Sequence, residues 1–171
     1  MTITGTYTMT LPGPMIQKGF WLYVWRVAAP DGQEWLYIGR TDDNSTPNAN
    51  APFTRMGQHL SMSKHQNALR KRLEEHHIDV GKCSAFQLIA HGPIHPEVNG
   101  PEGSHRDHLM MLHRPLRDEV GAYERDLTDA LRNAGYNVLN RVNWKRDGDA
   151  ARWRQIKIAF AEHFPMLADA D

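Results

Sequence analysis

Six side chains of types that act on phosphate groups are spread along this chain of 171 residues. They are, in chain order, Tyr23, Tyr37, Arg55, His59, Glu124 and Asn140. A guanidinium binds a phosphate through two parallel hydrogen bonds, and a histidine gains or loses a proton near neutral pH. A carboxylate that is partly removed from water needs a cation, either an arginine or a divalent metal ion such as Mg²⁺. If the fold brings these groups together, they form a site for phosphodiester chemistry.

Two pairs of spacings place some of these groups on helices. Arg55 and His59 are four residues apart, so a helix over residues 53–60 projects both from one side. Glu124 lies beside an apolar stripe over residues 116–134, four residues after Val120 and three before Leu127. Taken singly, each feature also fits an ordinary protein: the Arg-His pair as a solvated face, and the glutamate as a salt bridge at the edge of a core.

The length of the loop between the two tyrosines decides whether their side chains lie on the same face of the sheet. Residues 20–27 and 35–39 are rich in aromatic and β-branched side chains and predict two strands, with turn residues Pro30, Asp31 and Gly32 between them. Side chains alternate faces along a strand, and paired residues share a face. Tyr23 and Tyr37 therefore share a face only if the loop has an odd length, such as three or five residues; a two-residue turn would separate them.

The remaining elements predict an α+β fold with a small, mainly antiparallel three-stranded sheet flanked by helices. We expect helices over residues 53–60, 64–77, 105–113 and 116–134, with Pro115 separating the last two. A third strand is expected over residues 84–90 and a brief extended segment over 136–140. A final helix begins after the cap residue Asp149. Residues 92–104, with three prolines and three glycines, are expected to be irregular.

The chain is long enough for one domain with tails. We expect an N-terminal tail over residues 1–18, a domain over 19–143 that carries an insert at about 92–115, and a basic amphipathic helix over 144–171 packed on that domain. The single cysteine, Cys83, excludes an intrachain disulfide. No segment has the apolar length of a membrane span or the features of a secretory signal, so a cytoplasmic protein without membrane partners is expected.

The formal net charge is zero, but the charges are unevenly distributed. Six basic residues lie in 141–157 against two acids, and four lie in 64–72 with no acid. Such patches can neutralise phosphates locally, although each run alone also fits a solvated helix face. The candidate nucleic-acid-binding residues are Arg40, Lys64, Arg70, Arg141, Lys145 and Arg146.

Five histidines lie within residues 91–113 and raise a zinc site as a rival hypothesis: His91, His95, His105, His108 and His113. Without cysteines or a helical His-Glu pairing, scattered surface histidines are the better interpretation.

Four segments together resemble the GIY-YIG nuclease superfamily over residues 20–143. They are Trp21-Leu22-Tyr23, then LYIGRT from Leu36, then FTRMGQHL from Phe53, and YERDLTDALRNAGYNVLNR from Tyr123. The chain departs from the family in having Trp21-Leu22 where Gly-Ile is usual, and in longer intervals between the tyrosines and between Gly39 and Arg55.

The resemblance implies a metal-dependent endonuclease that hydrolyses DNA phosphodiester bonds. Glu124 would bind one Mg²⁺ or Mn²⁺, Tyr23 or Tyr37 would position or activate the attacking water, and Arg55 would hold the phosphate. His59 would contact the phosphate or a proton, and Asn140 matches the late asparagine of the family. One active site cuts both strands of a duplex only as a homodimer or in two successive nicks.

Two alternatives from other classes stay open. The first is a non-catalytic nucleic-acid-binding module that retains the GIY-YIG fold, and the second is a structural or interaction protein. Cleavage that stops in EDTA separates a nuclease from a binder, and salt-sensitive binding separates a binder from an interaction protein.

Overall fold

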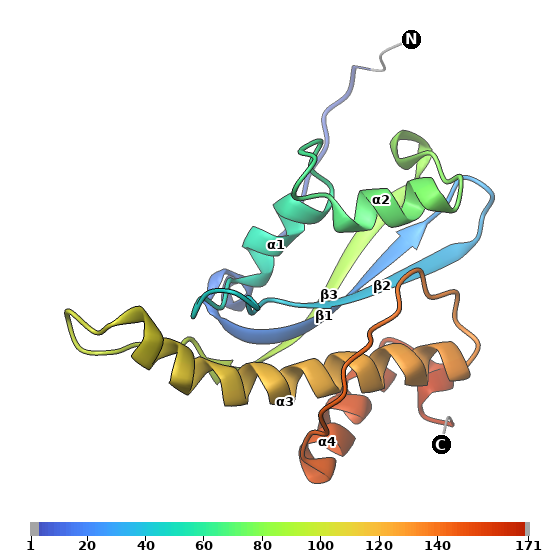
Figure 1. Cartoon of the computed structure of the whole chain (residues 1–171). Coiled ribbons are helices and arrows are strands. Elements are labelled where there is room, and N and C mark those ends of the chain that lie inside the picture. The colour runs from blue at the N-terminus through green and yellow to red at the C-terminus, as the bar shows by residue number, and fades with distance from the viewer. Residues whose placement is uncertain (1–3, 170–171) are drawn as a thin grey trace.

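The computed structural model describes residues 4–169, which form an α+β fold around one sheet (Figure 1). The sheet has the strand order β2-β1-β3, and both pairings are antiparallel. The strands are β1 (Gly19–Ala28), β2 (Glu34–Arg40) and β3 (Ala85–Pro96). The four α-helices of the described chain are α1 (Pro52–His59), α2 (Ala68–Glu75), α3 (Arg106–Asn133) and α4 (Ala150–Ala161). Three short 3₁₀ helices cover Gly13–Ile16, Val80–Lys82 and Pro165–Leu167.

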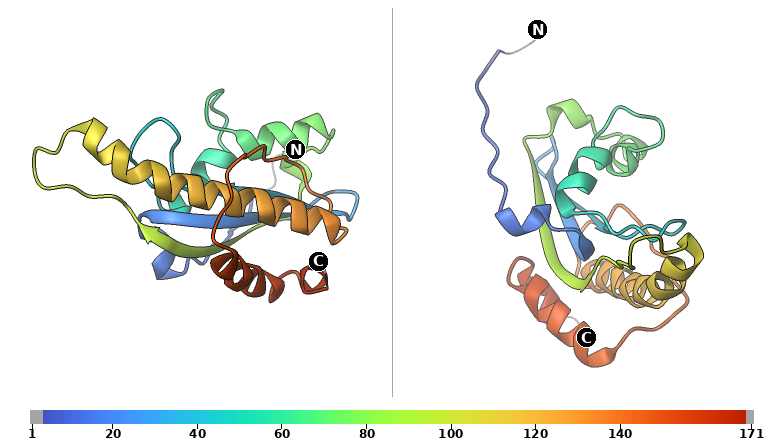
Figure 2. Two further views of the ribbon diagram at one scale, coloured as in Figure 1. Left: turned by 60° about the horizontal axis from the view of Figure 1, so that its bottom comes forward. Right: turned by 90° about the vertical axis from the view of Figure 1, so that its left-hand side faces the viewer.

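The helices cover opposite faces of the sheet: α1 and α2 lie on one face, and α3 and α4 on the other (Figures 1 and 2). Alternation along β1 divides its side chains between these layers. Phe20, Leu22 and Val24 join the core beneath α3 and α4, whereas Tyr23 and Trp25 join the cluster beneath α1 and α2. Both faces of β1 are therefore buried.

The hairpin has the odd loop that the two tyrosines require. Tyr23 pairs with Gly39 and Trp25 pairs with Tyr37, and the register leaves residues 29–33 as a five-residue loop. Gly32 adopts φ 82° in this loop, a conformation that favours glycine. The condition under which Tyr23 and Tyr37 share one face is therefore met, and both lie in the cluster beneath α1 and α2.

The prediction that residues 92–104 are irregular is wrong for residues 92–96, and the predicted break between two helices at Pro115 is wrong as well. β3 continues to Pro96, residues 97–105 form a loop, and α3 runs without interruption from Arg106 through Pro115. The helix continues across the proline because the segments before and after Pro115 both bury side chains in the same layer. Met110 and His113 are buried before Pro115, where His113 packs on Phe20 at 5.0 Å between ring centroids, and Val120 is buried after it.

The boundaries of two other helices can be compared with those predicted from the sequence. The helix expected over residues 64–77 is confined to Ala68–Glu75, because Lys64, His65 and Gln66 are exposed and give a helical turn no core to pack on. α4 begins as expected after Asp149, whose carboxylate accepts a hydrogen bond from the Arg152 backbone N–H at 2.7 Å. Ile156 and Phe160 of α4 are buried in the core under the sheet, so this helix packs on the domain.

No helix within residues 4–169 combines the length and the apolar character that crossing a membrane requires.

The segment before Asn140 runs parallel to the free edge of β2. Leu36 bridges to Val138, with backbone hydrogen bonds of 2.8 Å to Asn137 and Leu139 on either side. At the next position the Asn140 side chain replaces the backbone: its Oδ1 accepts from the Ile38 N–H at 3.0 Å, and its Nδ2 donates to the Ile38 carbonyl at 2.8 Å. The amide therefore attaches the extended segment after α3 to the strand that carries Tyr37.

We expect Asn140→Ala to lower the free energy of unfolding by about 2–4 kcal/mol, because it leaves two buried backbone groups of Ile38 without partners. Asn137→Ala is the matched control: its side chain makes one exposed hydrogen bond to the Glu34 carbonyl, and its loss is expected to cost less than about 1 kcal/mol. Urea unfolding of both variants measures the difference. Equal losses would contradict this role of Asn140.

Candidate active site

His59 lies between the two tyrosines of the hairpin. The Tyr23 hydroxyl and His59 Nε2 are 2.5 Å apart, and the His59 ring centroid lies 5.4 Å from that of Tyr23 and 5.1 Å from that of Tyr37. Gly39 permits this arrangement, since a Cβ on Gly39 would overlap the Tyr23 ring that lies across from it. The strand pairing and α1 therefore assemble three groups predicted from the sequence into one cluster.

Burial keeps this cluster uncharged at neutral pH. Burial and then the nearby Tyr37 hold the pKa of Tyr23 well above its usual value of 10.0. Burial and then Glu124 raise the pKa of Tyr37 to about 12. Burial and then the Arg55 guanidinium lower the pKa of His59 to about 4. Both tyrosines are thus hydroxyls and His59 is a neutral imidazole, so the cluster can exchange hydrogen bonds with a ligand without a net charge of its own.

Arg55 is held at the C-terminal end of β2. Its Nη2 donates to the carbonyls of Thr41 and Asp42 at 3.4 and 3.2 Å, and its Nη1 donates to Gln58 Oε1 at 3.1 Å. Two atoms here are buried without a hydrogen-bond partner in the described chain: Arg55 Nε and His59 Nδ1. Buried polar atoms of this kind are usually satisfied by an ordered water or by a polar ligand.

Glu124 is part of a charge cluster between α3 and the end of β2. Arg40 Nε donates to Glu124 Oε2 at 2.9 Å, Arg40 Nη1 pairs with Asp42, and Arg40 Nη2 donates to Asn44 Oδ1 at 2.8 Å. Trp144 covers this cluster, with its ring centroid 4.6 Å from the Arg40 guanidinium carbon. The prediction that Glu124 sits partly buried and requires a cation is confirmed, and the cation in the protein is Arg40.

Glu124 also opens into a pocket of about 480 Å³ that Tyr37, Asn140 and Arg141 line with it. Its second oxygen, Oε1, accepts no hydrogen bond within residues 4–169. Burial raises the pKa of Glu124 although Arg40 lowers it, so a further positive charge beside the carboxylate would stabilise its ionised form. One free carboxylate oxygen at a water-accessible pocket fits a Mg²⁺ or Mn²⁺ ion, which keeps several waters and takes one or two carboxylates.

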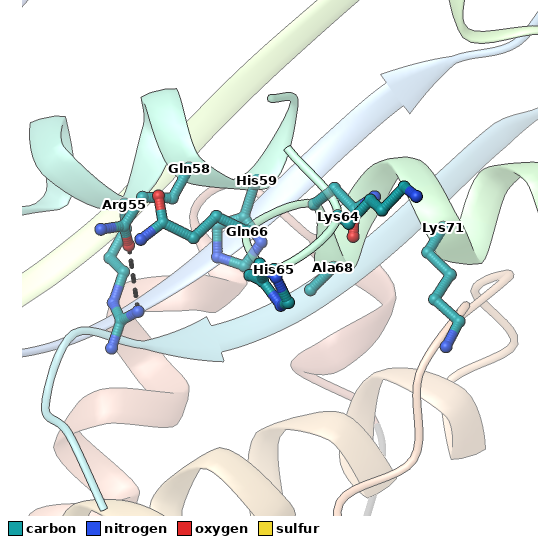
Figure 3. Close-up of a pocket in the computed structure, with 9 residues that line it drawn as sticks. Arg55, Gln58, His59, Lys64, His65, Gln66, Ala68 and Lys71 are labelled. Atoms are coloured by element: carbon teal, nitrogen blue, oxygen red, sulfur yellow. Dashed lines mark hydrogen bonds between the residues drawn. The ribbon is translucent and has the colours of Figure 1, made fainter. Parts of the chain in front are cut away.

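A second pocket, of about 330 Å³, lies between α1, the turn at residues 61–67 and the start of α2 (Figure 3). Arg55 and His59 line it from α1, and Lys64 and His65 from the turn. Lys71 and Ala68 border both pockets, which therefore adjoin.

The predicted nucleic-acid-binding residues fall into different environments. Lys64 and Arg141 line the two pockets, and Lys145 is exposed. Arg146 pairs with Asp118 at 3.0 Å and lines a different pocket, beside Arg114 and Asp147. Arg70 donates to the Leu60 carbonyl and thereby closes the turn before α2. Arg40 is buried in the charge cluster, and its guanidinium is engaged there by Glu124, Asp42 and Asn44.

The structure places one predicted residue in a structural contact, and it adds two residues that were not singled out from the sequence. Asn140 was expected to be catalytic, but both polar atoms of its amide are used by the Ile38 backbone. Asp42 was not singled out: it is buried, its Oδ1 has no hydrogen-bond partner within residues 4–169, and burial raises its pKa to about 7 although Arg40 lowers it. Its place two residues after the arginine that ends β2 was the available signal. Lys71 belongs to the basic segment over residues 64–72, but its position between two pockets could not be predicted from the sequence.

The histidines of residues 91–113 do not form a metal site. His95 bonds to Glu119 at 2.7 Å, and His113 to the Asp43 carbonyl at 2.9 Å. Within the described range, no three or more His, Cys, Asp or Glu side chains gather as metal ligands. The zinc hypothesis therefore lacks a ligand set there.

Comparison of the chain with protein-family models, curated proteins and solved structures finds no match.

The buried His59 predicts a specific loss of stability in acid. Its folded pKa of about 4 lies below the usual 6.5, so the unfolded chain takes up the proton first as the pH falls. Between pH 6.5 and 4.5 we expect the wild type to lose about 2 kcal/mol of stability that a His59→Gln variant does not lose. Glutamine keeps an acceptor for the Tyr23 hydroxyl but does not titrate. Denaturant unfolding at several pH values tests this, and parallel curves for the two proteins would refute it.

Proposed function

We propose that this protein is a metal-dependent endonuclease of GIY-YIG type that hydrolyses DNA phosphodiester bonds. The observation that carries the proposal is the convergence of Tyr23, Tyr37, Arg55 and His59 on one face of the sheet, beside Glu124 from the opposite helical layer. Phosphodiester hydrolysis requires a positioned water, a cation for the phosphoryl oxygens and a site for a metal ion, and these residue types supply them.

Arg55 is the phosphate ligand in this proposal. Its guanidinium is fixed by three acceptors, yet Nε remains without one in the part of the chain described. A bound phosphate oxygen would satisfy this donor at little entropic cost, because the side chain is already ordered. Lys71, which borders both pockets, adds a second positive charge near the same position.

The two tyrosines take different roles. The Tyr23 hydroxyl is buried and committed to His59, whereas Tyr37 lines the Glu124 pocket and its hydroxyl has no hydrogen-bond partner within residues 4–169. Tyr37 is therefore the group that contacts the attacking water. Because its pKa is raised to about 12, it orients the water as a hydroxyl, and it loses its proton only when positive charge gathers beside it.

Glu124 would hold the Mg²⁺ or Mn²⁺ ion through its free Oε1. The chemistry that such an ion supplies when bound is neutralisation of the negative charge that develops on the phosphoryl and leaving oxygens. Arg40 holds Oε2 and so fixes the direction of the carboxylate. Asp42, on the other side of Arg40, keeps that guanidinium in place.

DNA is the expected partner because the positive charge near the site is not balanced by acids. Lys64, Lys71 and Arg141 line the two pockets, and no acidic side chain within residues 4–169 lies within ion-pair distance of them. Cations that are not already neutralised can replace the counterions of a phosphate backbone.

The non-catalytic DNA-binding module remains the second candidate, and one observation favours it. Arg40 already neutralises Glu124, so the carboxylate is stable without a metal ion. Such a module would bind DNA equally well in EDTA.

Glu124→Ala tests the proposal most directly. We expect plasmid and single-stranded DNA cleavage with Mg²⁺ or Mn²⁺ to fall by about 10²–10³-fold, because the variant loses the metal ligand. Glu102→Ala, an exposed glutamate in the loop before α3, is the control and should cut like the wild type. Calorimetry should show Mn²⁺ binding to Glu102→Ala but not to Glu124→Ala. Equal cleavage by both variants would reject the metal assignment.

A pair of phenylalanine substitutions separates the tyrosines. Tyr37→Phe is expected to lower the cleavage rate about 10²-fold while changing stability by less than about 0.5 kcal/mol, since its hydroxyl has no partner in the described protein. Tyr23→Phe leaves His59 Nε2 buried and unpaired, and is expected to cost about 1–3 kcal/mol of stability. Cleavage assays and urea unfolding on both variants measure the two effects. The reverse pattern would exchange the roles.

A further inference from the structure

We propose that the pocket between α1 and α2 binds one unstacked nucleotide next to the scissile phosphate, so that the preferred DNA is single-stranded or unpaired at the cleavage site. This inference rests on the proposed nuclease function and extends it from DNA in general to DNA with an unpaired nucleotide. It assigns a ligand to the part of this pocket that lies beyond Arg55 and His59, which the cleavage chemistry itself does not need.

The pocket between α1 and α2 adjoins the pocket that Glu124 lines, because the two pockets share two lining residues. Ala68 and Lys71 border both, so a strand whose phosphate lies near Arg55 and Glu124 reaches the second pocket with its next nucleotide. The volume of about 330 Å³ is within the range of pockets that hold small ligands. In Figure 3, Arg55 and Gln58 lie at one end of the pocket, Lys64 and Lys71 at the other, and His65 and Gln66 between them.

The lysine end of the pocket suits a phosphate. Lys64 and Lys71 have no acidic partner within residues 4–169, whereas Arg70 and Arg72 in the same basic run pair with Glu74 and Glu75. The first turn of α2 also faces this pocket through Asn67 and Ala68, and the Asn67 side chain does not cap it. Its free backbone N–H groups add to the positive potential that the lysines supply.

The middle of the pocket carries groups that a phosphate does not require. His65 presents an exposed aromatic ring on which a base can stack. Gln66 and Asn67 supply amide donors and acceptors, which match the edges of bases. Gln58 uses Oε1 to accept from Arg55, so its amide nitrogen remains a donor directed by that bond. The combination of cations, an aromatic ring and amides indicates a whole nucleotide.

A base paired within a duplex cannot occupy such a pocket. Its faces are covered by neighbouring bases and its Watson–Crick edge is used by its partner, so a protein reaches only the groove edges. Placing a base between His65 and Gln66 requires that it leave the stack, which costs the least when the base is already unpaired. The geometry of the pocket therefore selects single-stranded, bulged or flapped DNA.

Binding of deoxyadenosine monophosphate without metal tests the pocket independently of cleavage. Titration of the full chain, followed by amide NMR, should perturb Gln58 and residues 65–68. Lys64→Ala and Lys71→Ala should each weaken binding about tenfold, whereas Lys82→Ala, an exposed lysine outside both pockets, should not. Inorganic phosphate should bind about tenfold more weakly than the nucleotide, since it gains no contact with His65 or Gln66. Equal binding of both, or no binding to the wild type, would overturn the inference.

DNA binding by the wild type in EDTA, compared on three forms of one sequence, tests the substrate. Single-stranded DNA and a duplex with one unpaired nucleotide should bind about tenfold tighter than the fully paired duplex, and Gln66→Ala should reduce this preference. Equal affinity for all three forms would reject the inference.

The outcomes also separate the inference from the function on which it rests. Nucleotide binding without cleavage of any DNA by the wild type would reject the nuclease and keep the pocket. Cleavage of paired duplex as fast as of single strands would keep the nuclease and reject the pocket as a determinant of the substrate.

Discussion

β1 lies between β2 and β3 and is buried on both faces, so most of its side chains belong either to the core or to the candidate site. Leu22 and Val24 anchor α3 and α4, and Tyr23 between them meets His59 on the opposite face. A shift of one residue in the pairing with β2 would exchange these faces. The five-residue loop that fixes the register therefore determines the core and the site together.

Arg40 connects the two layers where the sheet ends. Its guanidinium pairs with Glu124 from α3 and with Asp42 from the following loop, while Trp144 covers it. Removing one member of such a buried group leaves a charge uncompensated, which typically costs about 3–5 kcal/mol. Gly121 contributes indirectly, because a Cβ there would overlap the Trp144 indole. The orientation of the Glu124 carboxylate beside its pocket is thus set by packing and by Arg40.

A net charge of zero conceals a local excess of positive charge. Many arginines of this chain pair with acids, as Arg72 does with Glu75. Within residues 4–169, Lys64 and Lys71 pair with no acid, and they border adjoining pockets. In an average over the whole chain these charges cancel, but a phosphate within a Debye length of about 8–10 Å interacts mainly with the nearest ones. The proposal of a nucleic-acid ligand therefore rests on the distribution of charge and not on its sum.

The sequence by itself determined the hairpin, α1 with Arg55 and His59 on one side, and the Asp149 cap of α4, because each follows from spacing within one short segment. Strand alternation and helical periodicity state which side of its own element a residue occupies. Only the tertiary structure decided that α3 continues through Pro115, that Arg40 neutralises Glu124, and that the α1–α2 turn forms a pocket. These features depend on which elements meet across tens of residues of chain. That is a matter of packing and of partners for buried charges, which no local spacing encodes.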